Sequence, residues 1–251
     1  MSEIDRLPGF RRRFRVDTGA GWVRSAVEDD YHCMAVTLRH RAGVVEAVEP
    51  VMQRAPWTTC PGAVAQLRQT FTGVALDGFV SRGEKSANCT HLHDLALLAA
   101  AHACDDAPLV YDILASDPVG SHRQVELRRN GMRLLGWVEH EHRIVEPAEL
   151  AGRRLDELRS WIDTLDPDLQ EAARLLRWGA MLAHGRAIPM ERQMDASRMP
   201  PNCYSFQPER ARIAQRVGEI RDFSRGEAQL LDRPFDINSS RDGHATARLP
   251  A

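Results

Sequence analysis

The fold of this chain is decided by residues 10–51, which read FRRRFRVDTG AGWVRSAVED DYHCMAVTLR HRAGVVEAVE PV. Hydrophobic and polar residues alternate along three runs of this stretch, and a fourth, valine-rich run follows the turn at 41–43. Alternation with a period of two is typical of strands that bury one face. The stretch therefore predicts an antiparallel meander of four strands. The alternating apolar positions are Phe14, Val16, Val23, Val27, Met34, Val36 and Leu38.

Helices are expected to follow the meander. The Cys-Pro-Gly sequence at 60–62 starts the first one, because proline favours the first helical position, and Gly73 ends it. Asn88 is a good N-cap for a second helix, rich in alanine and leucine, in which Cys89 and His91 would occupy the first turn.

The second half of the chain begins with another strand pattern. The Asn-Gly pair at 130–131 is the preferred loop of a two-residue hairpin and predicts paired strands over 125–138. Helical spacing follows, so we expect one helix over 149–165, one over 167–184 and a shorter one from Pro208.

The predicted fold class is α+β, with an N-terminal antiparallel β-meander packed with helices and a helical C-terminal half. We expect an α+β domain over 1–110, a hairpin plus helical extension over 111–225, and a tail over 226–251. Trp161 and Trp178 fall on the expected helices and are assigned to packing.

The tail after residue 225 is polar and rich in turn residues, which is typical of disorder. Three apolar residues, Phe235, Ile237 and Leu249, are nevertheless spaced through it. We therefore expect the tail to lie across another surface, most simply that of a twofold-related subunit in a homodimer.

Composition limits the class of protein. With 251 residues, 43% of them hydrophobic, the chain is long enough for a well-filled core, and its net charge of −2 gives no basic field for nucleic acid. Five irregularly spaced cysteines and the polar opening sequence favour the reducing cytoplasm. No apolar run approaches the length of a membrane span, so neither a membrane nor nucleic acid is an expected partner.

Residues 88–95, NCTHLHDL, bring a thiol and two imidazoles to a helix start. The positive end of the helix dipole favours anions there and would lower the pKa of Cys89. His91 and His93 lie about 200° apart on an ideal helix, so they cannot both face one cavity.

A second dense cluster is the stretch 28–33, EDDYHC, at the start of an expected strand. Alternate strand residues share a face, so Asp30 and His32 would lie together, as a base and the carboxylate that orients it. The alternative is an acidic hairpin turn with an exposed edge.

Aromatic residues near these clusters suggest a flat binding wall. Tyr31 and Trp57, together with Trp22, could contact an aromatic ring, and Arg13 or Arg186 could bind a carboxylate or phenolate through two hydrogen bonds.

A metal site is the competing interpretation of the same residues. Cys60, Cys89 and His91 could supply three ligands if the two helix starts converge, with a fourth from His93 or Asp30. The close cysteine or histidine pairs of structural zinc sites are missing, and both thiols could instead be small buried apolar groups. We expect no metal.

Three motifs occur in order around the meander. They are Arg-Arg-Arg at 11–13, Pro-Trp-x-x-Cys-Pro at 56–61 and Cys-Thr-His-Leu-x-Asp-Leu at 89–95. This combination, over about residues 10 to 105, resembles the bacterial domain-of-unknown-function family 2889. The resemblance implies an accessory protein or enzyme of bacterial catabolism of aromatic compounds, lignin fragments or acyl thioesters.

The resemblance also distinguishes the two histidines. The family signature contains His91 and not His93, so His91 becomes the candidate general base or donor to a developing oxyanion. A histidine that merely caps the helix is the alternative.

Two functions remain open at this point. The first is a lyase without a cofactor that acts on a small lignin-derived aromatic substrate by acid–base chemistry, in a retro-aldol cleavage that releases formaldehyde. His91, Asp30 and His32 would be catalytic, and Arg13, Tyr31, Trp57 and Arg186 would bind the substrate. The second is a non-catalytic accessory protein that binds a metal or an acyl thioester.

Overall fold

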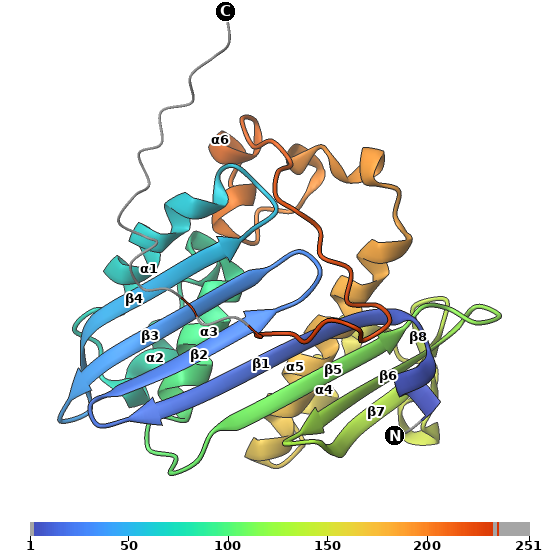
Figure 1. The fold of residues 1–251 in the computed structure, drawn as a ribbon, viewed down its shortest axis with the longest axis horizontal. Coiled ribbons are helices and arrows are strands. Elements are labelled where there is room, and N and C mark those ends of the chain that lie inside the picture. Colours follow the sequence, from blue (N-terminus) through green and yellow to red (C-terminus); the bar gives the residue numbers. More distant parts are fainter. Residues whose placement is uncertain (1–2, 233–234, 236–251) are drawn as a thin grey trace, which may run out of the picture.

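The computed structural model describes residues 3–232 and residue 235. In this part of the chain, eight strands form one antiparallel sheet with the order β4-β3-β2-β1-β5-β6-β7-β8 (Figure 1). The strands are β1 (Gly9–Gly19), β2 (Trp22–Glu28), β3 (Cys33–Arg41), β4 (Val44–Arg54), β5 (Leu109–Ser116), β6 (His122–Arg129), β7 (Met132–His140) and β8 (Arg143–Glu146).

The first four strands are the expected meander. Most of their inward residues are apolar, and Phe10, Phe14 and Val16 of β1 are all buried. The expected hairpin in the second half is also confirmed, because Asn130 and Gly131 both have the positive φ angles, 49° and 82°, of a type I′ loop.

The second half differs from the expected helical extension. Strands β5 to β8 form another meander, which joins the first through pairing of β1 with β5, where Phe14 lies opposite Tyr111. The expected boundary at residue 110 therefore falls inside β5, and the sheet continues to Glu146 before helices take over. The fold is α+β with one continuous sheet.

The helices are α1 (Ala63–Phe71), α2 (Phe79–Arg82), α3 (Thr90–Ala101), α4 (Arg159–Ile162), α5 (Pro167–Ala183) and α6 (Pro208–Ala211). Short 3₁₀ turns connect them, including Cys60–Gly62 directly before α1.

The prediction of a long helix over 149–165 was wrong. The chain there forms two 3₁₀ turns and the short α4. Gly152 has a left-handed φ of 84°, and its N–H bonds the Ile144 carbonyl at 2.8 Å, so this stretch pairs with β8 instead of forming a helix.

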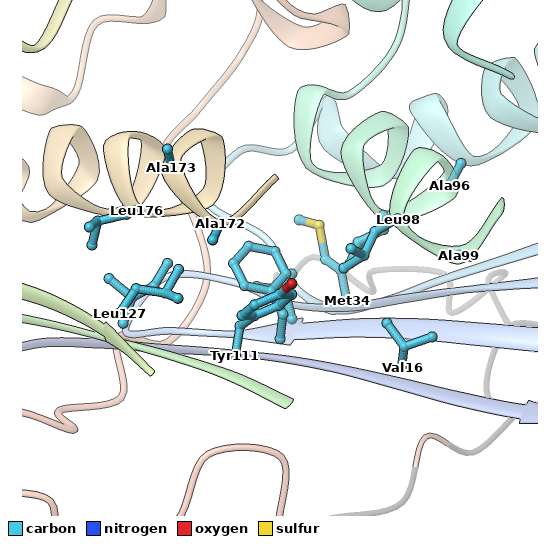
Figure 2. Close-up of a cluster of buried hydrophobic side chains, with 14 of the residues drawn as sticks. Val16, Met34, Ala96, Leu98, Ala99, Tyr111, Leu127, Ala172, Ala173 and Leu176 are labelled. Carbon is cyan, nitrogen blue, oxygen red and sulfur yellow. The ribbon is translucent and has the colours of Figure 1, made fainter. Parts of the chain in front are cut away.

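The core lies between one face of the sheet and the helices α1, α3 and α5. Figure 2 shows alanine and leucine side chains of α3 and α5 above Met34, Tyr111 and Leu127 of the sheet. Helix α5 approaches closely because Gly179 faces Ile113: a Cβ added at Gly179 would lie 2.8 Å from the Ile113 Cγ2 atom.

Residues 215–232, here called the strap, start beside Trp57 after the end of β4, and residues 221–232 then cross the opposite face of the sheet in an extended path (Figure 1). The Ser224 carbonyl accepts a bond from the Gly9 N–H, and the Arg221 N–H bonds the Asp30 carbonyl at 3.0 Å. Phe223, a residue of the strap, is buried. Ile237 and Leu249 of the expected tail lie outside the described residues.

Among the helices described, none has the length and apolar character needed to cross a membrane.

Candidate active site

A cavity of about 390 Å³ opens where α3 begins and α5 ends. Its walls come from the β2–β3 turn, the segment after β4, the first turn of α3, the last turns of α5 and the loop that follows α5. Cys60 and His91 line this same cavity, so the two helix starts do converge.

One wall holds a buried chain of charged groups that ends at His32. The His32 Nδ1 atom lies 3.0 and 3.2 Å from the two carboxylate oxygens of Asp29, and Asp29 also forms an ion pair with the buried Arg12. Backbone N–H groups of Tyr31 and His32 donate to the same carboxylate, at 2.8 Å each. The carboxylate is therefore fixed from four directions.

The ionisation of Asp29 follows from these partners. Burial alone would raise the Asp29 pKa, but His32 and Arg12 hold it well below its usual range. In the neutral tautomer of His32 that donates Nδ1–H to the ionised Asp29, the Nε2 atom carries the lone pair. No described residue bonds this Nε2 atom, and the His32 side chain lines the cavity.

His91 stacks on His32 with their ring centroids 3.9 Å apart and an angle of 28° between the rings. Burial, followed by the neighbouring His32, lowers the pKa of His91 well below its usual value, so His91 is neutral at pH 7. Its Nε2 atom is buried without a hydrogen-bond partner among the described residues.

His93 points elsewhere, as the helical geometry predicts. Its Nε2 atom lies 2.8 Å from the Gly83 carbonyl oxygen, and its ring packs 5.2 Å from that of Phe71. His93 is a buried packing residue, and His91 is the histidine of α3 that lines the cavity.

Aromatic rings form much of the remaining wall. Tyr31 and Trp57 line the cavity as expected, and Phe206 packs edge-on against Trp57 with ring centroids 6.0 Å apart. Trp178, assigned to packing from the sequence, also lines it and stands 6.1 Å from the His91 ring. Trp22 packs instead against Gly19 at the β1–β2 turn.

The expected pairing of Asp30 with His32 was wrong. Residues 29–32 lie in the turn between β2 and β3, so strand alternation does not apply to them. The Asp30 carboxylate forms an ion pair with Arg186, and burial raises its pKa to about 6. Arg186 also bonds Asp117 at 3.2 Å, and neither Asp30 nor Arg186 is a cavity-lining residue.

Arg13 is likewise directed away from the cavity. It lies on the face of β1 opposite Arg12, donates to Asp112 at 2.7 Å, and reaches the carbonyl of Leu230 in the strap at 3.4 Å. Arg12 shares the alternation of Phe10 and Phe14, which was the signal in the sequence that this arginine would be buried.

The cysteines at the helix starts are not activated. Burial raises the pKa of Cys89 to about 12 and raises that of Cys60 as well, so the expected lowering at the helix start was wrong. Helix α3 starts one residue later than expected, with Cys89 as N-cap, because the Asn88 side chain bonds Thr70 and Glu84 instead.

Cys60, Cys89 and His91 were the candidate metal ligands in the sequence. Among the described residues, no group of three or more histidine, cysteine, aspartate or glutamate side chains is arranged to hold a metal ion. Cys60, Cys89 and His91 thus share a cavity without forming a ligand group there.

Comparisons with known proteins add little to this geometry. A scan against models of protein families finds no match, and a search of curated proteins finds none. Among solved structures, the crystal structure of a viral glycoprotein aligns at 14% identity with a TM-score of 0.15. The alignment covers 79% of this chain and 61% of that one, which is less than two thirds of its length. A TM-score this low supports no conclusion about fold or function.

Proposed function

We propose that this protein is an enzyme that works by acid–base chemistry on a small aromatic substrate, without an organic cofactor. The observation that carries the proposal is the hydrogen bond between buried Asp29 and His32, because the His32 side chain also lines the aromatic cavity and its Nε2 atom has no partner among the described residues. A carboxylate that orients an imidazole is the usual arrangement of a general base.

The stacked rings of His32 and His91 have different roles in the proposed reaction. Two positive charges on rings 3.9 Å apart would repel each other, so one ring at most carries a proton in excess. Asp29 lies beside His32 and stabilises the charge there. In this proposal His32 takes the proton, and the neutral His91 binds a reacting oxygen as hydrogen-bond donor or acceptor.

The reaction that we propose is a carbon–carbon cleavage of the retro-aldol type. His32 removes the proton of a substrate hydroxymethyl group, and the O–H electrons form the C=O bond of formaldehyde. The electron acceptor is a quinone methide, which a phenolic substrate with a benzylic hydroxyl forms by losing that hydroxyl as water. The carbon–carbon bond breaks, and its electron pair forms a side-chain double bond while the quinone methide ring becomes a phenolate. The proton on His32 then returns to the product. The step needs no oxidant or reductant.

The substrate class rests on two supports. The rings of Tyr31, Trp57 and Trp178 offer flat apolar contacts in a cavity large enough for a compact aromatic compound. The resemblance to the bacterial family of unknown function suggests a place in the catabolism of lignin-derived aromatic compounds. A cytoplasmic location would suit that role.

The first experiment measures formaldehyde. Purified protein is incubated with a panel of lignin-derived phenolic dimers that carry a hydroxymethyl group, and products are followed by mass spectrometry. The His32→Asn variant should lose about 10²- to 10⁴-fold in rate, because a general base typically contributes that much. His122→Ala, which removes an exposed histidine outside the cavity, is the control.

Equal formaldehyde release by wild type and His32→Asn would remove His32 as the base. If no panel member reacts but the protein binds a stoichiometric metal or an acyl thioester, the accessory function replaces the lyase.

A further inference from the structure

Arg216, in the strap, is a partly buried arginine that lines the cavity. Its guanidinium carbon lies 5.4 Å from the centre of the Tyr31 ring and 5.3 Å from that of Trp57. Within residues 3–232, no carboxylate forms an ion pair with it. Other buried or partly buried arginines nearby do have one: Arg186 pairs with Asp30, and Arg54 with Glu28.

The position of Arg216 is fixed by its backbone. It forms an isolated antiparallel bridge with Trp57. On one side of the bridge the Thr58 N–H bonds the Gln215 carbonyl at 3.0 Å, and on the other the Val217 N–H bonds the Pro56 carbonyl at 2.9 Å. The backbone of Arg216 is therefore held on the same short ladder as that of Trp57, whose ring its side chain contacts.

The stacking decides which part of the guanidinium is available. Contacts with aromatic rings use the flat face of the group, whereas its N–H donors lie in the plane and point outward. Among the described residues, those donors have no hydrogen-bond partner. A planar fork of N–H groups matches the two oxygens of a carboxylate.

The charge of the surrounding wall favours an anion. Arg192 and Arg198 line the cavity together with Arg216, whereas Asp195 is the acidic residue among the lining side chains and is already paired with Arg198 at 3.3 Å. His32 and His91 add no negative charge. An acidic ligand would thus enter a cavity with an excess of positive groups.

We propose that Arg216 binds the carboxylate of an aromatic acid, whose ring packs among the aromatic side chains of the cavity. This inference names the substrate class of the proposed enzyme as aromatic carboxylates. It rests on the proposed function for the reaction itself. Arg216 takes the role that the sequence suggested for Arg13 or Arg186.

The test is a binding measurement that does not depend on turnover. Isothermal titration calorimetry compares 4-hydroxybenzoate with 4-hydroxybenzamide, which keeps the phenol and the shape but lacks the negative charge. Wild type should bind the acid at least 10-fold more tightly than the amide. Arg216→Ala should lose about 10- to 100-fold in affinity for the acid, as expected when a charged hydrogen-bond donor is removed.

Two matched variants distinguish a specific contact of Arg216 with the carboxylate from a general effect of positive charge on affinity. Arg216→Lys keeps the charge without the planar fork and should recover only part of the affinity. Arg212→Ala removes one exposed positive charge close by in the chain, outside the cavity, and should bind as wild type does. Thermal unfolding of each variant verifies that it is folded.

Equal affinity for acid and amide, equal loss in Arg212→Ala and Arg216→Ala, or no binding of either probe would each overturn the inference. The same titration with His32→Asn distinguishes it from the proposed reaction. If His32→Asn binds the acid normally, the Arg216 site is supported whether or not formaldehyde is released. If formaldehyde is released but the protein shows no preference for acids, the Arg216 site is wrong and the proposed reaction stands.

Discussion

Asp29 and Asp30 are neighbours in the sequence with opposite electrostatic behaviour. Asp29 touches Arg12, His32 and two backbone N–H groups, and its pKa lies well below the usual range. Asp30 is also buried, but burial outweighs its ion pair with Arg186 and raises its pKa to about 6. The difference comes from the number of donors around each carboxylate, which the sequence does not specify.

Replacing Asp29 with asparagine should destabilise the protein in a pH-dependent way. Because the folded-state pKa is depressed, the carboxylate stabilises the fold fully above the unfolded pKa, near 3.8, and this contribution declines as the pH falls from there toward the lower folded-state pKa. We expect Asp29→Asn to lose about 3–5 kcal/mol at pH 7, since a buried charge pair is broken. Urea unfolding at pH 7 and near pH 3 should show the difference shrinking in acid. A difference of equal size at both pH values would contradict this account.

Helix α5 depends on a residue without a side chain. Gly179 faces the buried Ile113, and the Cβ of any other residue would come within 2.8 Å of it. The helix can therefore lie close to β5 and bring Trp178 to the cavity.

Gly179→Val should lower the free energy of unfolding by about 1–3 kcal/mol, the usual range for overpacking a core. Gly185→Ala is the control, because a Cβ there meets nothing within 4 Å. Denaturant midpoints compare the two variants, and similar midpoints would show that the contact between α5 and β5 can relax.

Local signals predicted some elements and not others. The first meander, the Asn-Gly hairpin and α5 follow from periodicity and turn residues, which act over a few positions. The pairing of β1 with β5 depends on contacts between distant segments, and the loss of the helix over 149–165 depends on backbone pairing with the preceding strand β8, which helical spacing does not reveal. The same limit applies to the site. Tyr31, Trp57, Cys60 and His91 were expected together, whereas Arg216 reaches them only through the bridge to Trp57.

At the scale of the molecule, two meanders share one sheet, and the strap crosses the face that the helices leave uncovered (Figure 1). Within the strap, the Leu231 N–H bonds Glu28 at 2.6 Å and the Leu230 carbonyl accepts from Arg13. These contacts hold the described strap against its own sheet.

The homodimer stays a prediction. A chain that ends at Asp232 keeps the described contacts of strap residues up to 232 and removes the later apolar residues Phe235, Ile237 and Leu249. Light scattering should show a dimer for the full chain and a monomer for the shortened one, if those residues lie on a twofold-related subunit. A monomer in both cases, or a dimer in both, would argue against a role for the tail in association.

The strap also has a consequence for the order of folding. It joins Arg11 to Ser224 and Glu28 to Leu231, pairs separated by 213 and 203 positions in the chain. Contacts between such distant positions form slowly, since the intervening chain must first be brought into a closed loop. The neighbouring strands of each meander can pair early in folding. The strap, which carries Arg216, takes its place in the cavity wall late. During synthesis, a chain that has emerged from the ribosome only up to the end of α5 already contains His32 and His91. It still lacks Arg216, the residue that we propose binds the carboxylate.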